Sequence, residues 1–384
     1  MKIVFLENVV NYGGAKIATM NLAYQLPQYT SGEFETMIID VNGSCKPFVE
    51  ACQKHNIRLQ IANPGKTPTV LKGNGHLQTL VNKILFVPEY LENRSRIHKL
   101  LQEADPDWIF VNTERALSYL SGYKKGRAKV MFYAHYWYLN SQITKSNRYY
   151  FKKLADRFLC VSEATRQALY NNRIADIKDI YVAHNSIDER LTNVAPATIP
   201  DSDDCLKILL CGGFTEIKGQ HIAVEIARKL KERGLRFKMI FAGIIYEGGA
   251  SQRYYEKIVR MVETYDLRQE VVFVVGHSNV YDYIRAADIL IVPSSTEGFP
   301  LVIMEAQIMH KPVVANGVGG IIDLIHDDYT GFIANYNDVD DYVQKIVRLH
   351  DKSLYEFIAE NAYNFASHSL TVEAQIRSII NALN

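Results

Sequence analysis

The sequence predicts an α/β protein of two doubly wound domains, each with a parallel sheet covered by helices on both faces. Short apolar runs of strand length alternate with segments of helical periodicity along most of the chain, and this alternation is typical of parallel sheets. A chain of 384 residues is too long for one ordinary domain and fits two. With 48% hydrophobic and 22% charged residues, the composition is that of a globular protein rather than a disordered one.

The first half of the chain shows this alternation from its first residues. Lys2–Glu7 is expected to form a buried strand, and Ala15–Leu26 follows with helical periodicity up to a stop at Pro27. The further elements predicted here are strands at Thr36–Asp40, Trp108–Asn112, Val130–Ala134 and Phe158–Ser162, and helices at Pro47–His55 and Glu163–Tyr170.

The composition changes at residues 191–206, which contain Pro196, Pro200 and an acidic run and are typical of a linker. The sequence therefore predicts a first domain at 1–190, a second at 207–365, and a C-terminal helix at 366–384 that packs back toward the first domain. The elements predicted after the linker are strands at Lys207–Cys211, Lys238–Ala242, Val271–Val275, Ile289–Val292 and Val313–Ala315, and helices at Gln220–Arg233, Gln252–Tyr265, Tyr281–Arg285, Pro300–His310 and from Asp338 onward.

Cysteine usage and the absence of long apolar runs indicate the compartment. The five cysteines are scattered and form no CxxC pair, so neither a disulfide framework nor a zinc site is expected. The sequence contains no recognisable secretory signal and no run of about 18 apolar residues that could span a bilayer. We expect a cytoplasmic protein that can associate peripherally with the cytoplasmic face of the membrane.

The two halves of the chain differ in charge. Residues 1–190 carry 25 Lys and Arg against 17 Asp and Glu, whereas the remainder carries 18 against 25. Most of the basic excess lies in residues 120–158, where Asp156 is the only acid. Such a stretch indicates an anionic partner. Its aromatic residues also suit single-stranded nucleic acid, its charge suits an anionic membrane surface, and a charged face over core aromatics would give the same composition.

Residues 293–306 are the most informative segment. A predicted strand ends here, a polar loop follows, and a helix is expected to begin at Pro300, a residue that suits the first helical position. The free N–H groups of Leu301 and Val302 at that helix start would form an anion site.

Two carboxylates flank this helix start. Glu305 lies one turn into the helix, on the same face as Leu301, and Glu297 lies on the preceding loop. A single Glu would only stabilise the helix dipole. Two carboxylates beside a phosphate-facing helix end could bind a nucleotide diphosphate sugar, because they accept hydrogen bonds from ribose and sugar hydroxyls.

The pair Glu297 and Glu305, with Gly298, Phe299 and Pro300 between them, resembles the signature of the GT-B glycosyltransferases of family 4. The resemblance extends over nearly the whole chain. It implies the GT-B fold, with two Rossmann-like domains and an interdomain cleft, and a retaining, metal-independent enzyme that uses a UDP-, GDP- or ADP-sugar. It also implies that Glu305 binds the ribose, that Glu297 touches the transferred sugar, and that backbone amides between them hold sugar and phosphate.

Residues 212–220 link the first strand of the second domain to its first helix. They contain no Gly-Lys-Ser/Thr and so form no Walker loop. Lys218 on this Gly-rich turn could neutralise a diphosphate leaving group, or it could be a solvated surface lysine. The family pattern is Gly-Arg, four residues, then Lys-Gly. Lys218 matches the lysine, whereas Gly213 stands where the arginine is expected, so a substitute for this cation or altered donor binding is expected.

Three further segments resemble parts of the family's site. Gly13 and Gly14 link the first strand to the first helix, where the resemblance places donor phosphates and acceptor, although a Gly-Gly pair also makes plain tight turns. Gly276 and His277 resemble the loop that binds the nucleobase. His135 follows a predicted strand, at the end where sites occur. The resemblance places it beside the donor sugar, and a packed or surface histidine is the alternative.

The sequence predicts no metal site and no cofactor, because the nucleotide sugar is a substrate. The Asp201-x-Asp203 pattern invites a metal interpretation, but it lies in the expected linker, where solvated charge is the simpler account.

The predicted function is transfer of a sugar, with retention, from a UDP- or GDP-sugar to an acceptor hydroxyl in cell-surface polysaccharide or glycolipid synthesis. His135 and Glu297 would position the sugar, while Lys218 would stabilise the leaving phosphate. A polyprenyl-, lipid- or glycan-linked acceptor at an anionic membrane surface then accounts for residues 120–158 better than nucleic acid does. Two alternatives remain open: an enzyme like the GT-B UDP-GlcNAc 2-epimerases, and a non-catalytic binding or scaffold subunit.

Overall fold

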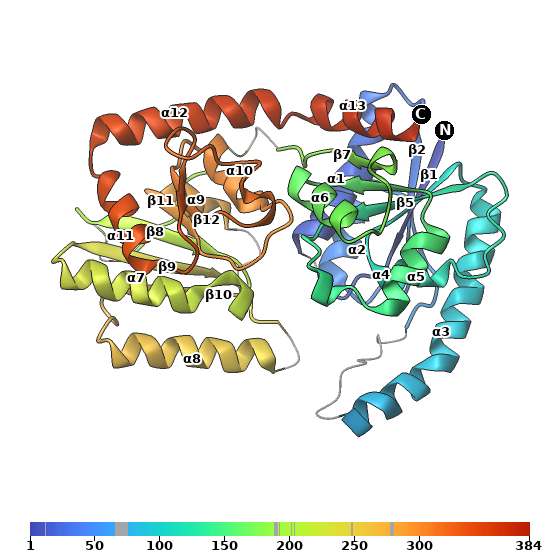
Figure 1. The fold of residues 1–384 in the computed structure, drawn as a ribbon, viewed down its shortest axis with the longest axis horizontal. Helices are drawn as coiled ribbons and strands as arrows, with labels where there is room; N and C mark the ends of the chain where they lie inside the picture. Colours follow the sequence, from blue (N-terminus) through green and yellow to red (C-terminus); the bar gives the residue numbers. More distant parts are fainter. Residues whose placement is uncertain are drawn as a thin grey trace. The chain divides into compact units, whose positions relative to one another are not determined.

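The computed structural model describes residues 1–11, 13–65, 76–187, 191, 193–200, 202, 204–246, 249–276 and 280–384. These residues form two compact units (Figure 1). The first comprises Met1–Ala183 with Gln375–Asn384, and the second comprises His184–Ala374. Residues of the expected linker, 191–206, are therefore counted with the second unit. Each unit contains one parallel sheet between helices, which confirms the predicted fold class.

The first unit is built on a seven-stranded sheet with the order β3-β2-β1-β4-β5-β6-β7. The chain order reverses at β1, which pairs in parallel with both β2 and β4. Helices α3 to α6 contribute to the core on one face of this sheet. The strands are β1 (Lys2–Glu7), β2 (Glu35–Asp40), β3 (Leu59–Ile61), β4 (Trp108–Val111), β5 (Lys129–Ala134), β6 (Arg157–Cys160) and β7 (Ile180–Val182), and the helices are α1 (Gly14–Tyr29), α2 (Lys46–Lys54), α3 (His76–Ala104), α4 (Glu114–Tyr119), α5 (Lys145–Leu154), α6 (Glu163–Asn171) and the last part of α13 (Val372–Leu383).

The second unit repeats this plan with six strands in the order β10-β9-β8-β11-β12-β13. Its order reverses at β8, and helices α7, α8 and α11 contribute to the core on one face of the sheet (Figure 1). The strands are β8 (Leu206–Cys211), β9 (Phe237–Gly243), β10 (Val271–Val275), β11 (Ile289–Val292), β12 (Val313–Asn316) and β13 (Phe332–Ala334), and the helices are α7 (Gln220–Glu232), α8 (Ala250–Thr264), α9 (Tyr281–Ala286), α10 (Leu301–Ile308), α11 (Val339–Arg348) and α12 (Lys352–Ser369).

The predicted helix stop at Pro27 is wrong, because α1 continues through this proline to Tyr29. Proline lacks an N–H, so a helix interior loses one hydrogen bond to the carbonyl four residues earlier. Here that carbonyl belongs to Ala23, and it accepts a hydrogen bond of 2.5 Å from the hydroxyl of Thr36. The Thr36 side chain on β2 thus replaces the missing donor, and the helix continues to Tyr29.

The longest helix of the first unit, α3, was missed by the sequence analysis, which expected no element between His55 and Trp108. It runs over 29 residues, contains Pro88 and has apolar residues on its exposed side. Ile84 and Leu85 are 61% and 68% exposed. Apolar side chains therefore occur around the helix rather than along one stripe, and the periodicity that reveals an amphipathic helix is weak. Among the described residues no helix is both long and apolar enough to cross a membrane.

An aromatic cluster fills the core of the first unit between β5, β6 and α5. Phe151 is fully buried and meets Phe132 edge to face, with 4.7 Å between the ring centroids. Phe158 lies 6.1 Å from Phe151 and 6.0 Å from Phe132, so the three rings contact one another. Rings that pack in this way bury large apolar areas and add favourable edge-to-face contacts.

Replacing Phe151 by Ala is therefore expected to destabilise the first unit by about 3 to 5 kcal/mol, because the change empties a closed part of the core. Urea unfolding of the full chain, followed by circular dichroism, measures this loss. Tyr149→Ala is the matched control, since Tyr149 is on the same helix but 53% exposed. It should change the free energy of unfolding by only about 0.5 kcal/mol. Equal unfolding midpoints for the two variants would contradict the packing described here.

Candidate functional site

The carboxyl ends of β8 and β11 bring the main candidate residues of the second unit together. In open parallel sheets, ligands bind beyond these ends, where the strand order reverses. The loop after β8 carries Gly213 and Lys218, and the loop after β11 carries Glu297 and leads into α10. Because β8 and β11 pair directly, the two loops are neighbours.

Two backbone contacts hold these loops against each other. The amide of Ser295 donates a hydrogen bond of 2.9 Å to the carbonyl of Ile217. Gly219 adopts a left-handed conformation with φ +74°, and a Cβ atom at this position would lie 2.3 Å from the carbonyl oxygen of Pro293. Only glycine allows both the backbone angle and the close approach. The relative position of the loops is therefore set by backbone geometry.

Lys218 and Glu297 form an ion pair across these loops. The Lys218 Nζ lies 2.7 Å from Glu297 Oε1. The Glu297 side chain is only 10% exposed and that of Lys218 is 32% exposed. The amide of Gly320 also donates to the Glu297 carbonyl, at 3.2 Å. Both predicted residues are thus held in one place, with the lysine the more accessible of the two.

Helix α10 begins at Leu301, so the expectation that Pro300 is its first residue is wrong. Pro300 is the N-cap, with an extended backbone of φ −71° and ψ 112°. Proline has no N–H to leave unpaired at this position. The amides of Leu301 and Val302 have no acceptor among the described residues, as expected for a helix start. Anion binding at these two amides stays a prediction.

Glu305 lies on the first turns of α10, close to the end of β8. Burial raises the pKa of its carboxyl from the ordinary 4.5 to about 7, and a hydrogen bond with Tyr281 opposes this rise. The Glu305 charge in turn contributes to the raised pKa of Cys211, the last residue of β8. Glu305 is therefore a carboxyl group that changes its charge near neutral pH.

The loop between β11 and α10 is anchored by two buried residues, Asn316 and Tyr342. The Asn316 Nδ2 donates to the carbonyl of Ser294 at 2.9 Å. The buried Tyr342 hydroxyl donates to Asn316 Oδ1 at 3.0 Å. Asn316 ends a buried strand and Tyr342 is an aromatic residue on an amphipathic helix. Only the position of Asn316 at a strand end could have indicated a role.

The remaining candidates of the second unit are Gly298 and Phe299 on the loop after β11, and Gly276 and His277 in the sequence after β10. The Phe299 ring stacks on His184, with centroids 4.9 Å apart and an interplanar angle of 8°. Gly298 is buried between Glu297 and Phe299. Gly276 follows β10 at φ +89°, with open space where a Cβ would project. His277 lies outside the described residues, as do Asp201 and Asp203.

In the first unit, His135 follows β5 and is buried. Burial, with a contribution from the Lys16 charge, lowers the pKa of its imidazole to about 3. Its ring lies 4.0 Å from that of Tyr133, and its Nε2 atom has no hydrogen-bond partner in the described part of the chain. This histidine is neutral at physiological pH, and its Nε2 is a buried atom. Gly13 is the N-cap of α1, Gly14 is its first residue, and a Cβ at Gly13 would meet no atom within 4 Å.

A buried polar cluster at the carboxyl ends of β1 and β4 was missed by the sequence analysis. Glu7 forms an ion pair with Lys16, and the Lys16 Nζ donates to Asn112 Oδ1 at 2.7 Å. The Asn112 Nδ2 donates to the other Glu7 oxygen at 2.7 Å. Burial raises the pKa of the Glu7 carboxyl, while Lys16 opposes the rise. Buried charges of this kind persist only when they are paired and hydrogen-bonded. In the sequence, the acidic Glu7 at the end of an apolar strand was the feature that could have indicated this cluster.

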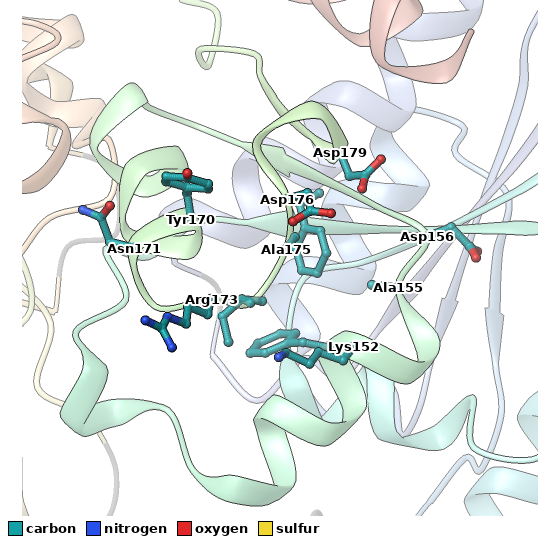
Figure 2. Close-up of a pocket in the computed structure, with 12 residues that line it drawn as sticks. Lys152, Ala155, Asp156, Tyr170, Asn171, Arg173, Ala175, Asp176 and Asp179 are labelled. Atoms are coloured by element: carbon teal, nitrogen blue, oxygen red, sulfur yellow. The ribbon is translucent and has the colours of Figure 1, made fainter.

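A separate cavity of 690 Å³ lies at the opposite end of the first sheet. Figure 2 shows its lining, with Lys152, Asp156, Arg173, Asp176 and Asp179 around it. Asp156 precedes β6 and Asp179 precedes β7, so the cavity is at the amino ends of these strands, away from His135. None of the predicted site residues that the structure describes lines it.

Part of the basic excess in residues 120–158 is paired within the first unit. Lys125 lies 2.8 Å from Asp156. Arg127 contacts Asp105 and Asp107, and Arg157 donates to the Ala382 carbonyl. The basic residues of this stretch that remain exposed without a carboxylate partner among the described residues are Lys124, Lys129, Lys145, Lys152 and Lys153.

Comparison with known families matches both halves of the chain. Residues 198–365 match the model described as glycosyl transferases group 1, and residues 48–191 match the model of glycosyltransferase family 4. Together these two segments contain all the second-unit candidates and His135.

Individual relatives of the chain are also named as glycosyltransferases. A D-inositol 3-phosphate glycosyltransferase of Mycolicibacterium smegmatis is 30% identical over 243 residues, which are 60% of this chain and 54% of that protein. An uncharacterized glycosyltransferase of Methanocaldococcus jannaschii is 28% identical over 57% of this chain and 58% of its own length. The chain thus spans just over half the length of these curated relatives.

Two further comparisons cover more of the chain. The Escherichia coli UDP-Gal:alpha-D-GlcNAc-diphosphoundecaprenol alpha-1,3-galactosyltransferase is 22% identical over 77% of this chain and 82% of its own length. The structure of Anabaena HepE in complex with UDP-glucose superposes with a TM-score of 0.80 at 19% identity, covering 100% of this chain and 99% of that one. At this identity the superposition shows a shared fold.

The raised pKa of Glu305 predicts a pH-dependent difference in stability between the protein and its Glu305→Gln variant. The folded protein holds the Glu305 proton up to about pH 7, whereas the unfolded chain releases it near 4.5. As the pH rises between these values, the unfolded state is therefore stabilised. The free energy of unfolding of the protein falls by about 1.4 kcal/mol per pH unit relative to that of the Gln variant. Above pH 7 the difference should become constant.

Urea unfolding of both proteins at pH 5, 6, 7 and 8 measures this difference. Glu356→Gln, an exposed change on α12, is the control, and its difference from the unmodified protein should not vary in this way. A Glu305→Gln difference that is flat from pH 5 to 7 would contradict an enclosed carboxyl.

Proposed function

Because the chain belongs to the group 1 glycosyltransferases of family 4, we propose that it transfers a sugar from a nucleotide sugar to an acceptor hydroxyl, with retention of configuration. The observation that carries this proposal is the group formed by Lys218, Glu297, Glu305 and the free amides of α10. These residues combine positive charge for a diphosphate with carboxylates for hydroxyl groups, on two loops fixed to each other.

Donor binding follows from the chemistry of these groups. The amides of Leu301 and Val302 and the ammonium of Lys218 favour phosphate oxygens. Glu305 would accept hydrogen bonds from the ribose hydroxyls, and Glu297 from the transferred sugar. Because the ion pair with Glu297 already fixes Lys218, little reorganisation is needed when negative charge develops on the leaving diphosphate.

The proposed reaction takes place on one face of the sugar. The bond from the acceptor oxygen to the anomeric carbon forms as the bond from that carbon to the diphosphate oxygen breaks. A leaving phosphate oxygen takes the proton of the acceptor hydroxyl, so no protein base is required. In the first unit, the neutral His135 has a ring nitrogen available to exchange a hydrogen bond with a sugar hydroxyl.

The names of the relatives support a class of donor and acceptor. The HepE structure contains UDP-glucose, and the E. coli relative is named for a UDP-galactose donor and a diphosphoundecaprenol-linked acceptor. We propose a UDP- or GDP-sugar donor and a polyprenyl-, lipid- or glycan-linked acceptor, as in cell-surface polysaccharide or glycolipid synthesis. The exposed Lys124, Lys145, Lys152 and Lys153 would favour an anionic membrane surface on the cytoplasmic side.

A thermal-shift screen with UDP-, GDP- and ADP-sugars tests donor binding directly, because a ligand that binds the folded state raises its apparent stability. One nucleotide class is expected to raise Tm clearly above the others. No shift with any of them at millimolar concentration would favour a scaffold subunit instead. NMR of the nucleotide sugar without an acceptor separates the epimerase alternative, and the anomeric configuration of the transferred product tests retention.

Replacing Glu305 by Ala is expected to lower turnover at least tenfold, through donor affinity or rate, because the ribose loses its carboxylate partner. The assay follows transfer of labelled sugar to a membrane extract. Glu356→Ala, an exposed change on α12, should retain full activity. Kinetics of Glu305→Ala equal to those of the unmodified enzyme would remove Glu305 from the donor site.

A further inference from the structure

The side chain of Tyr246 fills the space in which a side chain at position 213 would project. A Cβ atom on Gly213 would lie 2.2 Å from Cε2 of Tyr246, 2.6 Å from Cζ and 2.7 Å from the hydroxyl oxygen. These distances are far below any van der Waals contact, so a residue at 213 with a side chain and the present position of the Tyr246 ring exclude each other. The polar end of the tyrosine therefore lies directly over the Gly213 backbone.

Lys218 reaches the neighbouring glycine. A Cβ on Gly212 would lie 3.3 Å from Cδ of Lys218 and 3.5 Å from its Cε. The stem of the lysine thus covers Gly212 while the phenol of the tyrosine covers Gly213. Two side chains with polar ends, from different loops, converge on one two-residue turn after β8.

This turn leaves a hydrogen-bond donor unused. The Gly213 carbonyl accepts from Gln220 Nε2 at 3.1 Å, which fixes the orientation of the turn. The buried Gly213 amide has no acceptor in the part of the chain that the structure describes, and the Tyr246 hydroxyl has no partner there either. Both groups donate hydrogen bonds, and both lie next to Gly212, which the stem of Lys218 covers. The chemistry that would satisfy such a set of donors is an anion with several oxygens.

The backbone holds Tyr246 in this place. Its amide donates to Ser251 Oγ at 3.0 Å, and that hydroxyl donates to the Phe214 carbonyl at 2.7 Å. Phe214 follows Gly213 directly, and its amide donates to the Ile244 carbonyl at 3.0 Å. The segment after β9 is therefore tied to the turn after β8 on both sides of the tyrosine.

We propose that Tyr246 is a donor-binding residue whose hydroxyl donates a hydrogen bond to the diphosphate of the nucleotide sugar, in the space that a side chain at 213 would otherwise occupy. This inference rests on the proposed function of the same site. A neutral phenol supplies a directed hydrogen bond but no charge, so Lys218 remains the cation at this turn.

The test compares nucleotide binding by the unmodified protein and by Tyr246→Phe, which removes only the hydroxyl. Isothermal titration with UDP and GDP, each paired with its monophosphate, gives the four Kd values. For the diphosphate that binds, Kd is expected to rise about tenfold in Tyr246→Phe, because hydrogen bonds to charged acceptors are strong. The rise for the monophosphate should be smaller. Tyr329→Phe, a change at a 51% exposed tyrosine of the same unit, is the control and should bind as the unmodified protein does.

A second pair of variants tests the geometry. Gly213→Ala should displace the Tyr246 ring and weaken diphosphate binding as much as Tyr246→Phe does. In a Tyr246→Ala background, where the space is empty, the added Gly213→Ala should weaken binding no further.

The outcomes separate the two proposals. Diphosphate binding by Tyr246→Phe within twofold of the unmodified protein would overturn the role of Tyr246 and leave the proposed function standing. Absence of UDP and GDP binding by the unmodified protein would overturn both.

Discussion

The close approach of two backbone turns organises the second unit. Gly219 lies against the Pro293 carbonyl, and this contact exists only because residue 219 has no side chain and accepts a left-handed backbone. Lys218 precedes that glycine, and Glu297 lies four residues beyond that proline, so the contact decides where their charges meet. The ion pair, the start of α10 and the position of Glu305 all follow from the register of these two turns.

The two units place charge at the ends of their strands in different ways. In the first unit, Glu7, Lys16 and Asn112 pair with one another inside the protein and form a buried cluster. In the second unit, Lys218 keeps a third of its surface and the amides of α10 keep their hydrogens free. A ligand can therefore compete for the groups of the second unit, whereas in the first unit the Lys16 charge adds to burial in lowering the pKa of His135.

The sequence predicted most of the fold because strand and helix signals were local. The predicted Ile289–Val292 coincides with β11, and most other elements differ by one or two residues at their ends. The errors have identifiable physical causes. The hydroxyl of Thr36 allows α1 to pass Pro27, and the apolar residues of α3 do not follow a single stripe.

Of the site, Glu297, Glu305 and Lys218 could be selected from their motifs, whereas Tyr246 could not, because its contact with Gly213 joins two loops more than 30 positions apart.

A carboxyl group that titrates near pH 7 also makes a binding site responsive to pH. If the ribose hydroxyls are held by the ionised form of Glu305, then each donor molecule that enters displaces, on average, a fraction of a proton into the medium. The affinity for the donor then depends on pH. Under that condition a fall of pH through this range would weaken binding of the proposed nucleotide sugar without any change in its concentration.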